Sequence, residues 1–136
     1  MWSGVIRVFG INRENVLQRL AEWAQSLAGD PEVLAVVLFG SIARGDCTAA
    51  SDADVLVILR DSPLRFQDRI PLYRPSRIGV GVDVFPYTLA EARQSQAEGW
   101  GVVPPALKEG RVLYSANGSL SSLLAADASA GERGRE

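Results

Sequence analysis

The apolar positions along the chain follow two periodicities, one typical of a helix and the other typical of strands. At residues 13–28 the apolar positions recur at helical spacing, which predicts an amphipathic helix that is capped by Asn12 and lies on a sheet. Three later runs are rich in β-branched residues and predict strands at 33–39, 53–59 and 78–85. Because both faces of the second run are apolar, we expect it to be a central strand.

Shorter elements follow these runs. Pro86 is expected to end the third strand, and Thr88 and Glu91 form a capping box that opens a helix to Glu98. We also expect a short helix, a last helical turn and a final edge strand, at residues 64–70, 104–110 and 111–114.

These elements predict one α/β (α+β) domain, with a small mixed or antiparallel sheet flanked by helices, at residues 1–114. The 136 residues are 47% hydrophobic, which suffices for one modest core. From Ser115 onward the chain is rich in serine, alanine and glycine, so residues 115–136 are predicted to be a disordered tail. Within that tail, Leu120, Leu123 and Leu124 are candidates for docking on the domain.

The composition argues against several classes of function. A formal net charge of −2 gives no general nucleic-acid footprint, so nucleic acid is not the expected partner. The chain has no histidine, which argues against a zinc site and against histidine acid–base chemistry, and the single Cys47 excludes an intrachain disulfide. We find no membrane-spanning run and no signal peptide, which predicts a cytoplasmic protein without a membrane partner.

Asp52 and Asp54 open the second predicted strand. Residues i and i+2 of a strand point to the same face, so the two carboxylates project side by side. Adjacent carboxylates repel each other unless a cation lies between them, and Mg²⁺ usually binds one or two carboxylates together with substrate phosphates. An Asp-x-Asp pair alone is more often just the polar end of a strand, so the neighbouring turn is needed to favour a metal site.

The turn that precedes this pair has the features of a phosphate-binding site. We expect the Ser41 hydroxyl to cap a short helical turn whose free N–H groups attract anions. Gly40 tolerates a positive φ and allows the backbone to approach a phosphate closely. Arg44 is placed to offset negative charge or, alternatively, to pair with Asp46 or Asp52. Together, the turn and the Asp pair predict a phosphoryl-transfer site that handles nucleotides.

The chain resembles the minimal nucleotidyltransferases of the DNA polymerase β superfamily, a family that also includes the kanamycin-type antibiotic nucleotidyltransferases. The resemblance is carried by two motifs, Gly40-Ser41-x-Ala43-Arg44-Gly45 and Ser51-Asp52-x-Asp54-x-Leu56-Val57, and extends more loosely over residues 12–114. The family usually has leucine after the second aspartate, where this chain has the similar Val55. The resemblance implies the nucleotidyltransferase fold.

A third carboxylate, Asp83, lies in the third predicted strand. If the second strand runs antiparallel to both neighbours, the Gly-Ser turn, the Asp pair and Asp83, near the exit of the third strand, meet at one edge of the sheet. Asp61 and Asp68 follow the far end of the second strand and fail this test. The family carries a third metal-binding aspartate on a following strand, and the resemblance places it at Asp83. An exposed strand residue without a role is the alternative.

The resemblance also implies a reaction. A nucleoside monophosphate, expected to be AMP, would pass from a nucleoside triphosphate to an acceptor hydroxyl by two-metal catalysis with Mg²⁺ or Mn²⁺, releasing pyrophosphate. Catalysis and metal binding are assigned to Asp52, Asp54 and Asp83, and phosphate binding to Gly40, Ser41 and Arg44.

Partnership is left between two alternatives. Proteins that resemble this one often act beside a small helical HEPN-domain protein, as an antitoxin that masks the partner or modifies it with AMP, and a homodimer is the other expectation. Trp100, Val102 and Val103 are expected to be exposed for such a contact. An antibiotic-modifying role is less favoured, because no second domain is expected that would hold an aminoglycoside.

Overall fold

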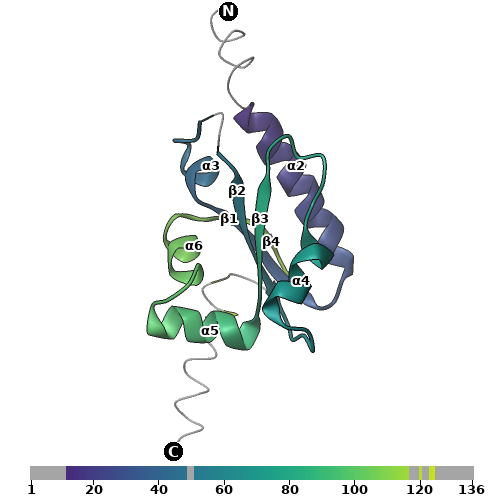
Figure 1. Cartoon of the computed structure of the whole chain (residues 1–136), viewed down its shortest axis with the longest axis vertical. Helices are drawn as coiled ribbons and strands as arrows, with labels where there is room; N and C mark the ends of the chain where they lie inside the picture. The colour runs from purple at the N-terminus through teal and green to yellow at the C-terminus, as the bar shows by residue number, and fades with distance from the viewer. Residues whose placement is uncertain (1–11, 49–50, 117–119, 121–122, 125–136) are drawn as a thin grey trace, which may run out of the picture.

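The computed structural model describes residues 12–48, 51–116, 120, 123 and 124. Its centre is a four-stranded mixed sheet with the strand order β3-β2-β1-β4 (Figure 1). β1 (Val33–Phe39) pairs antiparallel with β2 (Ala53–Leu59) and with β4 (Arg111–Ser115), whereas β2 pairs parallel with β3 (Val82–Thr88). The predicted fold class is confirmed, and β1 and β2 have the predicted bounds.

Local capping signals set the helix ends. The Asn12 side chain accepts a hydrogen bond from the Asn15 N–H, and the predicted capping box of Thr88 and Glu91 is present. The first predicted helix divides into an α-helix and a short 3₁₀ turn, and the helix predicted at 64–70 begins two residues later and continues through Pro71. The helical elements are α2 (Arg13–Ser26), η1 (Leu27–Gly29), α3 (Ser41–Arg44), α4 (Phe66–Tyr73), α5 (Leu89–Glu98) and α6 (Val103–Glu109).

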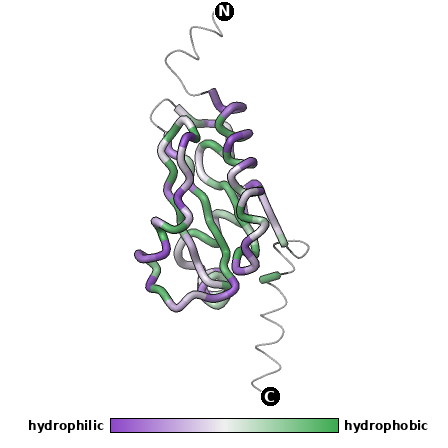
Figure 2. Tube along the Cα trace, turned by 90° about the vertical axis from the view of Figure 1, so that its right-hand side faces the viewer, coloured by the Kyte–Doolittle hydropathy of each residue, from purple (hydrophilic) through white to green (hydrophobic). Residues whose placement is uncertain are grey.

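Two apolar clusters cover the two faces of the sheet. On one face α2 packs through Val16, Leu20 and Ala24, and on the other face α6 packs through Val103 and Ala106. The strands form a largely hydrophobic interior, while polar residues gather on the outer turns of the helices (Figure 2). Successive residues of β2 alternate between the two clusters, which confirms that β2 is a central strand.

β3 differs from the prediction in both its bounds and its direction. It begins at Val82 rather than at residue 78 and ends at Thr88, so Pro86 lies inside the strand instead of ending it. Proline is tolerated there because β3 is an edge strand of this sheet. The expected antiparallel pairing with β2 is wrong, because the connection through α4 returns the chain to the same end of the sheet, as a parallel pair requires.

Part of the predicted C-terminal tail packs on the domain. Leu120 and Leu124 are buried in the cluster beside α6, as expected for docking residues, while residues 117–119, 121–122 and 125–136 of the predicted disordered tail lie outside the described residues. Of the residues expected to be exposed, Trp100 is 43% exposed, but Val103 is buried because it faces the sheet from the first turn of α6. In the part of the chain described, no helix is long and apolar enough to cross a membrane.

Candidate active site

One edge of the sheet gathers the features predicted from the two motifs. Gly40 follows the last residue of β1, and in the antiparallel pair Phe39 lies opposite Asp54. Across the parallel pair Asp54 lies opposite Asp83, so both side chains project from the same face of neighbouring strands. Asp61 follows the other end of β2, as expected.

The meeting of these residues was predicted from a wrong topology. Asp83 lies at the entry of β3 rather than near its exit, and β3 is parallel to β2 rather than antiparallel. Each difference alone would have moved Asp83 to the far edge of the sheet, and together they return it to the edge that carries Asp54.

Negative charge accumulates around Asp54. The pKa of Asp54 is raised above its ordinary value, first because partial burial disfavours the charged carboxylate, and then because Asp83 and Asp52 repel it. The positive charge of Arg44 partly counteracts this effect, whereas the nearby Glu109 adds to it. The cluster therefore carries more negative than positive charge, which is the environment that a cation would stabilise.

Two glycines let the backbone lie directly against the Asp pair. Gly40 has φ +82° and ψ −162°, and a Cβ at this position would overlap Oδ2 of Asp54. A Cβ on Gly81 would lie 2.7 Å from Oδ1 of Asp52, and the Gly81 carbonyl accepts a 2.9 Å hydrogen bond from the Ala53 N–H. Gly81 directly precedes β3 and does not lie inside it.

The donor set fits a divalent cation that is shared with a phosphate. Carboxylate oxygens are the ligands that Mg²⁺ and Mn²⁺ prefer, and the charge on the Asp pair is undercompensated. Within the described residues no three His, Cys, Asp or Glu side chains form a group that could hold a metal ion by themselves. A metal at this edge would therefore take part of its coordination from substrate phosphate and water.

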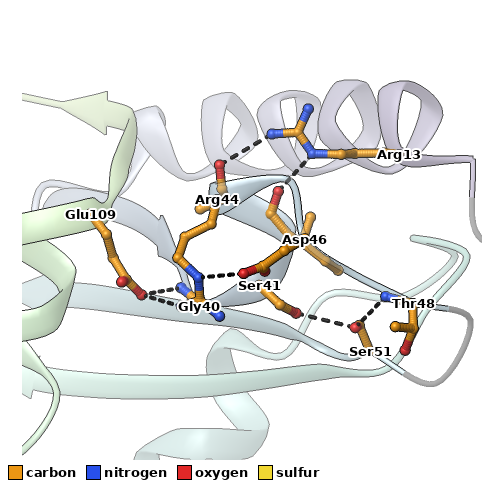
Figure 3. Close-up of polar contacts among 10 residues, drawn as sticks. Arg13, Gly40, Ser41, Arg44, Asp46, Thr48, Ser51 and Glu109 are labelled. Atoms are coloured by element: carbon orange, nitrogen blue, oxygen red, sulfur yellow. Dashed lines mark hydrogen bonds and ion pairs between the residues drawn. The ribbon is translucent and has the colours of Figure 1, made fainter.

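The Ser41 hydroxyl does not cap the turn, contrary to the prediction, and its assignment to phosphate binding stays a prediction. Gly40, not Ser41, is the N-cap of α3, and the Ser41 hydroxyl donates to Oγ of Ser51 over 3.1 Å (Figure 3). Oγ of Ser51 also accepts from the N–H of Thr48 over 2.8 Å. Ser41 is the first helical residue, so its side chain points to the loop before β2 and ties the turn to the segment that carries Asp52.

The backbone of the turn remains able to bind an anion. The N–H groups of Arg44 and Gly45 donate to the carbonyls of Gly40 and Ser41, over 3.0 and 2.9 Å. Within the described residues, the N–H groups of Ser41, Ile42 and Ala43 have no hydrogen-bond partner. Unpaired amides at the start of a helical turn are donors for phosphate oxygens.

Arg44 is engaged by two carboxylates in this structure. Its Nε lies 3.2 Å from Oδ2 of Asp46, one of the two partners weighed from the sequence, and its Nη1 lies 2.8 Å from Oε2 of Glu109 (Figure 3). The Arg44 side chain is 43% exposed, so it remains accessible to a ligand at the rim of the turn.

Sequence reasoning missed three residues that hold the turn. Arg13 of α2 donates from Nε to the Ile42 carbonyl over 2.8 Å and from Nη2 to the Ala43 carbonyl over 3.1 Å. Glu109 accepts from the Gly40 N–H over 3.1 Å, and Ser51 accepts from Ser41. Ser51 was visible as a member of the second motif, whereas Arg13 and Glu109 had no local signal.

The comparisons with known proteins agree with this geometry. A family model described as "Nucleotidyltransferase domain" matches residues 17–108, well over half of the chain. "Putative protein adenylyltransferase MJ0604" of Methanocaldococcus jannaschii is 34% identical over 79 residues, which are 58% of this chain and 76% of that protein. "Putative protein adenylyltransferase MJ1305" of the same organism is 37% identical over 60 residues, 44% of this chain and only 40% of the relative's length.

Among solved structures, a crystal structure described as a toxin–antitoxin with AMP-PNP aligns over 90% of this chain and 88% of that chain, with 18% identity and a TM-score of 0.47. At that TM-score the alignment does not by itself establish a common fold. The family model, in contrast, spans both motifs and the sheet edge that they form. The chain therefore belongs to the nucleotidyltransferase domain family and is a nucleotidyltransferase.

Proposed function

We propose that this protein transfers AMP from a nucleoside triphosphate to an acceptor hydroxyl and releases pyrophosphate. The observation that carries the proposal is the pairing of Asp54 with Asp83 directly beside the Gly40-Ser41 turn. Carboxylates that can hold a cation and amides that can hold phosphate then lie at one edge of the sheet, as in-line displacement at a phosphate requires.

Each part of the edge has a role in this proposal. The N–H groups that begin α3 would bind the β- and γ-phosphates, Arg44 would offset their charge, and Ser41 would keep the turn against the loop that carries Asp52. Mg²⁺ or Mn²⁺, if held by Asp52, Asp54 and Asp83 together with substrate phosphate and water, would supply charge neutralisation and a lower pKa for the acceptor hydroxyl. Asp83 is exposed and forms no ion pair with the other described residues, so its carboxylate would be free to accept the proton of the acceptor hydroxyl.

The two relatives named as putative protein adenylyltransferases support AMP as the transferred group and a protein as the acceptor. Both names describe the relatives themselves, and MJ1305 extends well beyond the 40% of its length that this chain matches. The nucleotidyltransferase domain match covers residues 17–108, and this part of the chain would bind the nucleotide.

The sharpest test compares two exposed aspartates at opposite ends of the sheet, Asp83 and Asp61. Asp83→Asn should keep the fold and much of the nucleotide binding, but transfer of labelled AMP should fall by about 100- to 10,000-fold, because the acceptor hydroxyl loses its base. Asp61→Asn is the matched control and should transfer AMP like the unmodified protein. Full transfer by Asp83→Asn together with loss in Asp61→Asn would refute the assignment.

Metal dependence gives a second test of the same proposal. Titration of ATP by calorimetry, with Mg²⁺ and then with chelator, should show much weaker binding without the metal, because the carboxylates around Asp54 repel the triphosphate. Equal affinity in the two conditions would contradict a shared metal site.

A second candidate role is that of an antitoxin beside a small helical HEPN-type protein, and one observation favours a protein contact of this kind. Phe66, Tyr87 and Trp100 line, together with Glu91, an open cavity of about 270 Å³ on the face covered by α5. Trp100 is 43% exposed, and aromatic side chains of this kind are enriched at protein interfaces. Trp100→Ala should weaken co-purification of a helical partner from the source cells, and a strictly monomeric protein without any partner would count against this role.

A further inference from the structure

Glu109 contacts the phosphate-binding turn from a distant part of the chain. Its Oε2 accepts a 3.1 Å hydrogen bond from the Gly40 N–H and lies 2.8 Å from Nη1 of Arg44 (Figure 3). The Glu109 side chain is 26% exposed, so most of its surface is covered. One carboxylate oxygen therefore joins the backbone and the cation of the same turn.

The position of Glu109 is set by the end of α6. Gly110 follows directly, and a Cβ there would overlap the Ala106 carbonyl and lie 2.7 Å from Cγ1 of Val37 in β1. The Gly110 N–H also donates to the Ala106 carbonyl over 2.9 Å. Only glycine lets the helix end lie this close to β1, and this close packing places Glu109 within reach of Gly40.

Gly40 is the residue whose backbone most needs such support. Its φ of +82° and ψ of −162° lie in a region that essentially only glycine adopts, and such conformations persist when their surroundings hold them. The Gly40 N–H donates to Glu109, and the Gly40 carbonyl accepts a 3.0 Å hydrogen bond from the Arg44 N–H. The orientation of the Gly40 peptide in turn sets the direction of the amides that follow it.

We propose that Glu109 is a positioning residue for nucleotide binding, which orients the Gly40 peptide and the Arg44 guanidinium toward the phosphates of the substrate. This inference rests on the proposed function, because it concerns the same phosphate site. Alternatively, the Glu109 carboxylate could compete with phosphate for the donors of Gly40 and Arg44. Removal of Glu109 would weaken ATP binding if it positions these donors and would strengthen ATP binding if it competes for them.

The test uses the full chain and two readouts. Hydrogen exchange of the Gly40 amide, followed by NMR without nucleotide, reports the contact itself, and calorimetry with ATP and Mg²⁺ reports its consequence. In Glu109→Ala the Gly40 amide should exchange faster and the affinity for ATP should fall about 10-fold or more, because a hydrogen bond to a charged group is lost. Glu98→Ala is the matched control, because Glu98 also ends a helix before a glycine but bonds to Trp100.

Two conservative variants distinguish the reach of the Glu109 side chain from its charge. They also provide the test if Glu109→Ala does not fold. Glu109→Gln keeps the length and an acceptor oxygen, so it should bind ATP nearly as well as the unmodified protein. Glu109→Asp keeps the charge but shortens the reach, so it should bind ATP more weakly than Glu109→Gln. The reverse order, or tighter binding by Glu109→Ala, would overturn the inference while leaving the proposed function intact. If the unmodified protein binds no ATP, the proposed function fails and this inference fails with it.

Discussion

Gly40→Ala is the substitution that most directly tests how the turn and the Asp pair fit together. Gly40 has a backbone conformation that alanine adopts only with strain, and the added Cβ would overlap Oδ2 of Asp54 and lie 3.3 Å from its Cγ. The substitution therefore strains the backbone and displaces a carboxylate that we assign to the metal.

The expected loss of stability has two parts. A residue held in a sparsely populated backbone region costs of order 1–3 kcal/mol, and overpacking a closely packed site costs typically about 1–3 kcal/mol more. The free energy of unfolding should therefore fall by about 2–6 kcal/mol, a large part of the roughly 5–15 kcal/mol that holds a typical domain. ATP binding should weaken as well, because Asp54 is displaced.

Gly99→Ala provides the control for backbone strain alone. Gly99 has φ +77° and ψ +27°, and no described atom lies within 4 Å of a Cβ built there. Its replacement should cost only about 1–2 kcal/mol, the left-handed penalty of an L-residue. Urea unfolding measures the free energy of unfolding of both variants. In an Asp54→Ala background the Cβ of Gly40→Ala no longer overlaps the carboxylate. The double-mutant cycle therefore isolates the cost of this overlap as a coupling energy of about 1–3 kcal/mol.

The reasoning would be refuted by equal losses in Gly40→Ala and Gly99→Ala together with a coupling near zero. That result would mean that Asp54 moves aside without cost, so that the contact between the turn and the carboxylate does not define the site.

Three further predictions concern the elements that support the site. In Glu91→Gln the buried Arg69 loses its charged partner, so urea unfolding at pH 7 should show a lower free energy of unfolding than for the unmodified protein. The hydrogen bond from Arg69 lowers the pKa of Glu91, so this difference should shrink as the pH falls through the pKa of Glu91 in the folded protein. An equal difference at pH 3 and pH 7 would contradict the prediction. Arg13→Gln should weaken ATP binding in calorimetry, because α3 loses two bonds to its carbonyls, whereas Arg19→Gln, the control on the same helix, should not. Leu124→Ala should lower the free energy of unfolding by about 2–5 kcal/mol, because Leu124 is buried, and a negligible change would show that this contact is not formed in solution.

The sequence by itself determined the elements whose signals are local. The continuous apolar runs predicted β1 and β2 to the residue, and Asn12, Thr88 and Glu91 marked helix starts through bonds to backbone groups within three residues. The two motifs likewise located the turn and the Asp pair, because both lie within one short stretch of chain. Such features follow from side-chain periodicity and capping, which do not depend on the rest of the fold.

The tertiary structure alone decided the direction of β3 and the partners of the turn. Whether β3 runs parallel or antiparallel to β2 depends on where α4 returns the chain, and residues 60–81 carry no pattern that states this. Glu109 reaches Gly40 across 69 positions of sequence, and Arg13 reaches Ile42 across 29. Contacts of this kind arise only after helices pack on the sheet, because packing, rather than any local preference, brings a side chain within hydrogen-bonding distance of a remote backbone group.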